Sequence, residues 1–308
     1  MRQLLYCIIF IMFFFIMLLF PEIVFYGASN GLLLWFQSIL PTLLPFIMIS
    51  NLLIYSNATY YISCFLRPVF QKLFGVSVES CYAILVGFLC GYPMGAKTVS
   101  DLVKQSRITR NEGQYLLSFC NNTSPMFLVS FLALQNFKNS SLIFATLFIS
   151  IFSPIICSFF FRIFYRKHAN KTIVAQKMLN TDIKKSFKFS LIDDSIMNGF
   201  ETITKVGGYI ILFSILFSLG KQLPFTWFLP CLEISNGIPW IMDMDIPFYI
   251  AFPFALGVTS FGGFCAIMQT YSMIQESKLQ ILPYIIQKLI TAMVTSLIAF
   301  CYIRFIHQ

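Results

Sequence analysis

The chain has 308 residues, of which 58% are apolar and 11% charged, against about 45–50% and about 25% in an ordinary soluble domain. A soluble fold could not cover so many apolar side chains, whereas a lipid bilayer accepts them as its own surface. The net charge of +9 does not indicate a nucleic-acid partner, because eight of the 21 Lys and Arg residues lie in one stretch, 162–188. These features exclude a cytosolic enzyme and predict an all-α polytopic membrane protein with a single integral membrane domain, 1–308.

Six apolar stretches are long enough to cross the membrane, since the hydrocarbon core takes about 20 helical residues. The first of them, within 1–29, is expected to remain as a transmembrane helix, because it lacks the clear small-residue cleavage site of a signal peptide. The six predicted crossings are 4–26, 32–54, 113–134, 141–165, 196–219 and 281–304.

Two further apolar stretches, 78–106 and 248–276, are interrupted near their middles. Gly-Tyr-Pro-Met-Gly at 91–95 breaks the first, and Thr-Ser-Phe-Gly-Gly at 259–263 breaks the second. Because Gly and Pro clusters of this kind end helices, we predict that both stretches are re-entrant helical hairpins. The alternative is two kinked helices that span the membrane, which gives eight crossings.

Charge sets the predicted orientation, because short loops rich in Lys and Arg stay in the cytoplasm. The basic loop 166–195 is therefore placed inside, and both termini are expected to be cytoplasmic. The order crossing, hairpin, crossing then occurs at 32–134, within a first repeat of 30–165, and again with the opposite orientation at 196–304, within a second repeat of 196–308. Such an inverted repeat with paired interruptions is typical of transporters and indicates where the solute binds.

The tip of the first hairpin is predicted to lie near the middle of the membrane and to bind the solute. Its glycines allow unusual backbone angles, and the helix that follows directs its free N–H groups and positive dipole end at the tip, which favours an anion. Lys97 supplies a charge there, unless it only anchors the hairpin at the cytoplasmic face or pairs with Asp101. The candidate solute-binding residues of this hairpin are Gly91, Tyr92, Pro93, Gly95, Lys97 and Thr98.

Polar residues also interrupt the third crossing, where Pro125 removes a helix hydrogen bond. Irregular backbone is tolerated at this depth only against protein or a water-lined cavity. We therefore predict that the segment binds a polar solute; the alternative is hydrogen bonding that holds the helices together. The second hairpin offers hydroxyls and a Gly pair that lets a ligand approach the backbone, and small residues of this kind suit helix packing equally well. The candidates from the two segments are Asn121, Asn122, Thr123, Ser124, Thr259, Ser260, Gly262, Gly263 and Gln269.

Charged residues inside the other crossings have ordinary interpretations. Glu201 and Lys205 are expected to pair on one helix face, and Lys288 is expected to extend outward to the membrane surface. Apart from Glu201, no acidic side chain is expected deep in a crossing. Coupling to protons or sodium through a buried carboxylate therefore has little support, although carbonyls and polar side chains still suit sodium.

The sequence predicts no enzyme. Nine Cys and two His show no metal-ligand spacing, and no nucleophile or phosphate-binding motif occurs. We expect neither a metal nor a cofactor.

Three strings of residues resemble one protein family. They are Gly87-Phe-Leu-Cys-Gly-Tyr-Pro-Met-Gly-Ala-Lys97, Asn121-Asn-Thr-Ser-Pro-Met126 and Gly257-Val-Thr-Ser-Phe-Gly-Gly263. Over about 30–304, the chain resembles the sporulation integral membrane protein YlbJ family, one of the nucleoside-recognition or Gate domain membrane proteins. The Gly-Tyr-Pro-Met-Gly-Ala-Lys string is the most specific part, and the motif in the second half is weaker.

The resemblance implies a function that composition and spacing do not name. Members of the family are implicated in moving dipicolinic acid, and the resemblance places the chain in the outer forespore membrane of the mother cell during sporulation. More distant Gate relatives resemble nucleoside transporters with two re-entrant hairpins. Dipicolinate is a flat aromatic dianion, so helix N-termini, Lys97 and amide or hydroxyl groups would hold its carboxylates, with Tyr92 or a Phe against its ring.

Three functions stay open at this point. The preferred one is a membrane transporter of dipicolinic acid or a similar small organic anion, with that solute and the lipid bilayer as partners; a homo-oligomer is left open. The second is a nucleoside or nucleobase transporter. The third is a non-transporting structural or assembly protein of the spore envelope, whose basic loop docks a partner or anionic lipid.

Overall fold

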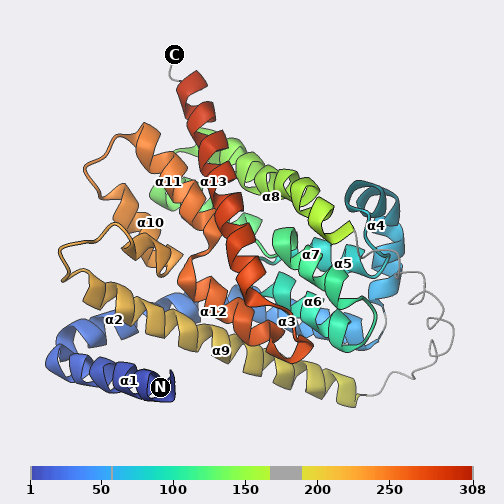
Figure 1. Cartoon of the computed structure of the whole chain (residues 1–308), viewed down its shortest axis with the longest axis horizontal. Helices are drawn as coiled ribbons and strands as arrows, with labels where there is room; N and C mark the ends of the chain where they lie inside the picture. Colours follow the sequence, from blue (N-terminus) through green and yellow to red (C-terminus); the bar gives the residue numbers. More distant parts are fainter. Residues whose placement is uncertain (1, 57, 167–188, 307–308) are drawn as a thin grey trace.

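The computed structural model describes residues 2–56, 58–166 and 189–306, and all regular structure in these ranges is helical. Most of the predicted basic loop 166–195 lies outside them. The helices form one bundle (Figure 1). The described helices that are long and apolar enough to cross a membrane are 21–55, 140–165, 190–220, 248–277 and 281–305. This architecture confirms the predicted class, an all-α polytopic membrane protein.

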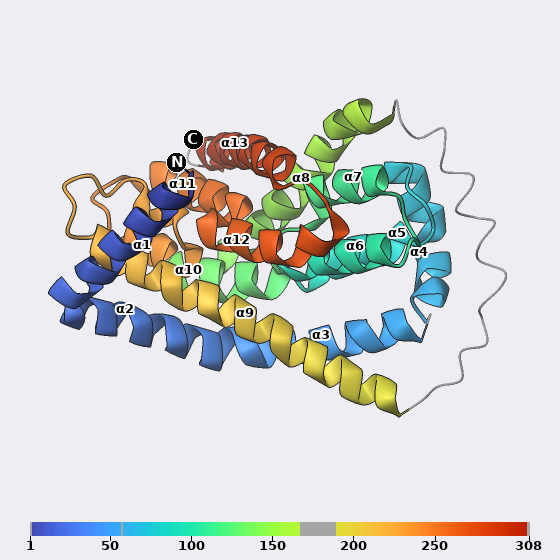
Figure 2. The same ribbon diagram turned by 60° about the horizontal axis from the view of Figure 1, so that its bottom comes forward.

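The N-terminal crossing differs from the prediction of 4–26. The first helix ends at Leu19, Phe20 has non-helical angles (φ −124°, ψ 55°), and Pro21 starts a second helix. Proline suits this first helical position, because its missing N–H has no partner there in any case. The second helix continues to Tyr55 as a single long crossing, and the first helix turns back beside it (Figure 2). The elements here are α1 (Arg2–Leu19), α2 (Pro21–Leu34), the π-helix η1 (Trp35–Ile39) and α3 (Leu40–Tyr55).

The long helix α9 (Ser190–Gly220) packs antiparallel against α2 and α3 (Figure 2). The Trp35 indole N–H donates to the carbonyl oxygen of Ile203 at 3.0 Å. Nearer the other end, the Asn51 amide donates to Asn198 Oδ1 at 3.1 Å. Contacts along their whole length therefore hold α9 against the continuous helix formed by α2 and α3.

The first interrupted stretch, 78–106, forms the predicted hairpin. Its arms α5 (Ser80–Leu89) and α6 (Met94–Lys104) pack against each other. At about 1.5 Å per residue each arm rises only about 15–17 Å, roughly half the hydrocarbon thickness, so neither can cross alone. The helix α4 (Thr59–Phe74) packs on α5.

The predicted crossing at 113–134 is also broken. The helix α7 (Arg110–Cys120) ends before the non-helical residues 121–124, and the π-helix η2 (Phe127–Asn136) follows. The short η3 (Ser140–Leu142) leads into α8 (Ile143–Arg166), which returns along both α7 and η2. The polar interruption in this crossing is confirmed.

The second interrupted stretch, 248–276, differs from the predicted hairpin. Its helices α11 (Phe248–Phe261) and α12 (Gly263–Ile274) run on in one direction, and α13 (Ile281–Ile306) lies antiparallel along both (Figure 1). At one end Thr270 hydrogen-bonds Tyr284 at 3.4 Å, and towards the other end Ser296 donates to the carbonyl oxygen of Pro253 at 2.9 Å. Because the start of α13 contacts α12 and its later part contacts α11, the two helices α11 and α12 must lie end to end along it. The stretch is a broken crossing like α7–η2.

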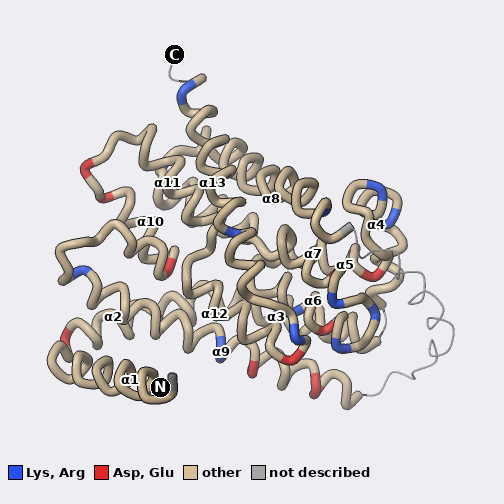
Figure 3. Tube along the Cα trace, viewed as in Figure 1, with Lys and Arg blue, Asp and Glu red and all other residues tan. Residues whose placement is uncertain are grey.

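Short elements complete the fold: η5 (Leu229–Cys231), α10 (Ile234–Met242) and η6 (Gln275–Ser277). Charged residues gather mainly at the end of the molecule that α4, α6 and the start of α9 form (Figure 3). The opposite orientation of the two repeats and the cytoplasmic position of both termini stay predictions.

Candidate functional site

The tip of the first hairpin is seated in the break of the third crossing. Gly91 has a φ of +83°, and the peptide bond between Tyr92 and Pro93 is cis. The Tyr92 N–H donates to the carbonyl oxygen of Asn122 at 2.7 Å. A Cβ on Gly91 would lie only 2.8 Å from the backbone nitrogen of Ser124. Gly91 is therefore required both by its backbone angle and by the close approach of two chain segments.

Asn121, in the break that follows α7, connects three other helices. Its side chain is fully buried. Its Oδ1 accepts from the N–H of Ala96 in the first turn of α6 at 3.2 Å, and its Nδ2 donates to Thr270 Oγ1 and Tyr284 OH, each at 2.9 Å. A single amide thus fixes the positions of α6, α12 and α13 around the break.

Lys288 departs from its prediction. Its side chain does not reach the membrane surface but is 1% exposed, and its Nζ lies 3.2 Å from the carbonyl oxygen of Asn121 and 3.3 Å from Asn122 Oδ1. Among the described residues no carboxylate pairs with it. Hydropathy does not show which face of α13 points into the protein. The signal in the sequence was a single charged residue within an apolar crossing, since such residues usually face the protein interior.

The second break lies against the first break and the hairpin tip. Gly262 and Gly263 have φ of +86° and +76°, which favours glycine at both positions. A Cβ on Gly262 would be 3.3 Å from the Tyr92 ring. The Thr123 hydroxyl donates to the carbonyl oxygen of Thr259 at 3.0 Å. The three interruptions predicted from sequence therefore meet in the interior.

The second half has a contact similar to one in the first half, with donor and acceptor exchanged. In the first half, the hairpin tip bonds the break through Tyr92 and Asn122. In the second half, the turn between η5 and α10 bonds the start of α12, where the Cys265 N–H donates to the carbonyl oxygen of Leu232 at 2.9 Å. The short η5–α10 turn therefore lies against the second break as the hairpin tip lies against the first, whereas 248–276 contains the break itself.

Glu233 is a buried acid that the sequence pattern did not single out. Its side chain caps α10, where it accepts from the N–H of Ser235 at 3.0 Å and of Asn236 at 2.9 Å, and it is 4% exposed. These amides and the positive end of the helix compensate its charge. The signal in the sequence was its place just before a short apolar helix, where capping residues occur.

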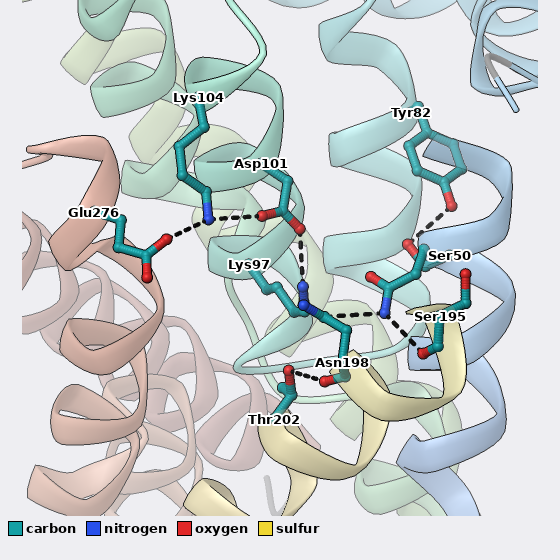
Figure 4. A network of polar contacts seen from close by, with 10 residues as sticks. Ser50, Tyr82, Lys97, Asp101, Lys104, Ser195, Asn198, Thr202 and Glu276 are labelled. Atoms are coloured by element: carbon teal, nitrogen blue, oxygen red, sulfur yellow. Dashed lines mark hydrogen bonds and ion pairs between the residues drawn. The ribbon is translucent and has the colours of Figure 1, made fainter. Parts of the chain in front are cut away.

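Lys97 is held by a chain of ion pairs (Figure 4). Its Nζ lies 2.9 Å from Asp101, Asp101 also contacts Lys104 at 3.3 Å, and Lys104 reaches Glu276 at 2.8 Å. The pairing with Asp101 that the spacing offered as an alternative is therefore present. The chain extends from the buried Lys97 to an exposed carboxylate beside α12 and ties the hairpin to that helix.

The other predicted residues contribute to packing around the meeting point. A Cβ on Gly95 would be 2.5 Å from the carbonyl oxygen of Cys120, so α6 lies directly against α7. Ser260 accepts from Thr295 at 3.1 Å, and Gln269 contacts the sulfur of Cys265 at 3.2 Å within α12. The hydroxyl of Thr98 is buried without a hydrogen-bond partner.

The structure shows the site in a closed form. Asn121, Thr259 and Lys288 are each no more than 1% exposed. A groove of about 930 Å³ lies elsewhere, between the end of α3 and the start of α9, and Tyr55 and Asn198 are among its lining residues. Access to the site therefore requires movement of the elements that cover it.

Substitution of Lys97 separates its two interpretations. In Lys97→Gln, Asp101 still has its ion pair with Lys104, so we expect the free energy of unfolding to fall by only about 1 kcal/mol. Uptake of the predicted solute is expected to stay within about threefold of the wild type. Lys205→Gln is the matched control, since Lys205 pairs with Glu201 at 2.7 Å with the same four-residue spacing, as predicted. Loss of uptake in a folded Lys97→Gln protein, with Lys205→Gln unaffected, would instead place Lys97 on the solute.

Fold and site together define a class: a polytopic α-helical membrane protein whose interrupted helices meet in its interior. The comparisons agree with this class. The family described as "Gate: Nucleoside recognition" matches residues 36–167. The chain is 26% identical, over 309 aligned residues, to the sporulation integral membrane protein YlbJ of Bacillus subtilis (strain 168), an alignment that covers 88% of this chain and 75% of that protein. The resemblance predicted from the motifs is confirmed. No solved structure matches the chain.

Proposed function

We propose that this protein is a carrier of small organic anions, with dipicolinate as the solute to test first, acting in the outer forespore membrane. The observation that carries the proposal is Lys288. Its buried ammonium hydrogen-bonds two neutral oxygens and pairs with no carboxylate of the described residues, which places positive charge at the point where three chain interruptions meet. Ionisable groups inside a membrane are costly and are found where a solute or ion passes.

The surrounding groups suit a carboxylate. The Thr123 hydroxyl and the Asn121 amide lie at the meeting point, and the N–H of Ala96 in the first turn of α6 points at the Asn121 amide. Glu233, a buried acid near the second break, has its carboxylate oxygens engaged by α10. An anion therefore gains from the Lys288 charge and the dipoles of the site, while the amides of α10 compensate the charge of Glu233.

A nucleoside carrier is the second candidate, and the match to the nucleoside-recognition family favours it. A nucleoside carries no charge and is recognised by amides and acids that hydrogen-bond its ribose and base. Asn121 and Asn122 offer amides, but their polar atoms are engaged by α6, α12 and Lys288. The arrangement favours the anion.

Uptake into proteoliposomes tests the proposal. We expect saturable uptake of dipicolinate, uptake of uridine no higher than in protein-free liposomes, and at least about tenfold loss of dipicolinate uptake in Lys288→Met, where a typical charge-assisted contact is lost. Lys205→Gln serves as the control for altering an exposed lysine.

Each result has a distinct meaning. Uridine uptake without dipicolinate uptake would overturn the anion proposal in favour of the nucleoside carrier. If neither solute moves under ion gradients of either sign, the protein is not a carrier of these solutes, and a structural or assembly role in the spore envelope takes its place.

A further inference from the structure

The C-terminal end of α7 has the features of a cation site. Helix ends leave carbonyl groups without intrahelical partners, and the aligned peptide dipoles make this end negative. Asn121 follows the last residue of α7 in non-helical conformation, so its carbonyl oxygen points away from the helix. In transporters built from broken helices, such ends and unwound carbonyls hold the coupling cation.

In this protein a side chain already occupies that position. The Nζ of Lys288 lies 3.2 Å from the carbonyl oxygen of Asn121 and 3.3 Å from Asn122 Oδ1. One backbone and one side-chain oxygen are the ligands that a hard cation would take. An ammonium has three N–H groups, and these two contacts use two of them.

The environment of Lys288 leaves little reason for a second cation to bind. Its side chain is 1% exposed, and no carboxylate among the described residues pairs with it. A free ion at the same oxygens would have to displace the ammonium, and one beside it would meet like-charge repulsion in a low-dielectric interior.

We propose that Lys288 is a resident cation, which takes the place of a coupling ion at the break of the third crossing. This inference rests on the proposed function. The lysine holds the break to α13, keeps its third N–H for a carboxylate of the solute, and makes sodium unnecessary for transport.

The test compares Lys288→Ala, which removes the ammonium and leaves space, with Lys288→Met, which removes the charge and fills the space. Dipicolinate uptake by the wild type is expected to be equal in sodium, lithium and choline media. Uptake by Lys288→Ala is expected to be low in choline and to rise about fivefold or more with sodium or methylammonium, the range of a typical coupling between two ligands. Uptake by Lys288→Met is expected to stay low in every medium.

A second measurement does not depend on transport. Sodium or methylammonium is expected to raise the thermal unfolding temperature of Lys288→Ala, but not that of the wild type or of Lys288→Met. If Lys288→Ala aggregates in choline, purification in methylammonium is expected to recover it, and aggregation in every salt counts against the inference.

The failures are distinguishable. A wild type that moves dipicolinate only with sodium overturns the resident cation and leaves the carrier function standing. A Lys288→Ala protein that matches the wild type in choline overturns it as well. A wild type that moves no solute overturns the carrier function, and the thermal measurement then still decides whether Lys288 occupies a cation site.

Discussion

Replacing Gly87 with Ala is expected to stop the first hairpin from docking and to lower the free energy of unfolding by about 3 kcal/mol or more. A Cβ at this position on α5 would overlap the carbonyl oxygen of Cys120 at the end of α7. That oxygen belongs to the backbone and cannot rotate away as a side chain can. Both arms of the hairpin use the same contact, because Gly95 on α6 also faces this oxygen. Thermal unfolding of the detergent-purified protein measures the loss.

Gly208→Ala is the matched control for this prediction. A Cβ there meets no atom within 4 Å, and Ala favours the helix over Gly by up to about 1 kcal/mol. We expect Gly208→Ala to unfold at or slightly above the temperature of the wild type. Equal unfolding temperatures for the Gly87 and Gly208 variants would contradict the close packing of the hairpin on α7.

Replacing Asn121 with Ala is expected to lower the free energy of unfolding by about 2–4 kcal/mol, because it leaves buried polar groups without partners. The Ala96 N–H loses its acceptor, and the hydroxyls of Thr270 and Tyr284 lose a shared donor. Since these groups lie on three helices, we also expect dipicolinate uptake to fall at least about tenfold, as the site is no longer held in place. Thermal unfolding and uptake are measured on the same preparation.

The exposed Asn139 provides the comparison. It caps η3 by accepting from the N–H of Ser141 at 3.0 Å, so Asn139→Ala removes an Asn of similar local role outside the site. Its cost is about 1 kcal/mol or less, with uptake unchanged. An Asn121→Ala protein no less stable than Asn139→Ala would show that the amide does not connect the helices as described.

The first hairpin and the break of the third crossing were predictable because their signals are local. Gly91 and Pro93 end one helix and start another, and the polar run before Pro125 interrupts a crossing wherever the rest of the chain lies. The meeting of these two interruptions followed from placing both at the middle of the membrane. The family resemblance rests on the same residues, and the comparisons confirm it.

The second half depends on packing that no local pattern encodes. A Gly pair in an apolar stretch suits a hairpin and a broken crossing equally well, and only the contacts of α13 along α11 and α12 decide between them. The inward direction of Lys288 depends on the rotation of α13 about its axis, which the neighbouring helices set. The sequence did not single out Glu233, because the backbone amides that bind its carboxylate leave no pattern of side-chain charge.

The antiparallel contact of α13 with α11 and α12 determines which parts of the protein can move. Tyr284 of α13 hydrogen-bonds α12, and Ser296 of α13 hydrogen-bonds α11. The helix α13 therefore bridges the interruption at Gly262 and holds α11 and α12 in fixed positions. We therefore expect the three segments to move together, despite the two glycines between them. The first hairpin contacts these segments through the Tyr92 ring against Gly262 and through the ion pair of Lys104 with Glu276, just after α12. For the proposed carrier, we therefore expect a passage to open between the hairpin and these segments, by tilting of the hairpin, while the glycine joint stays closed.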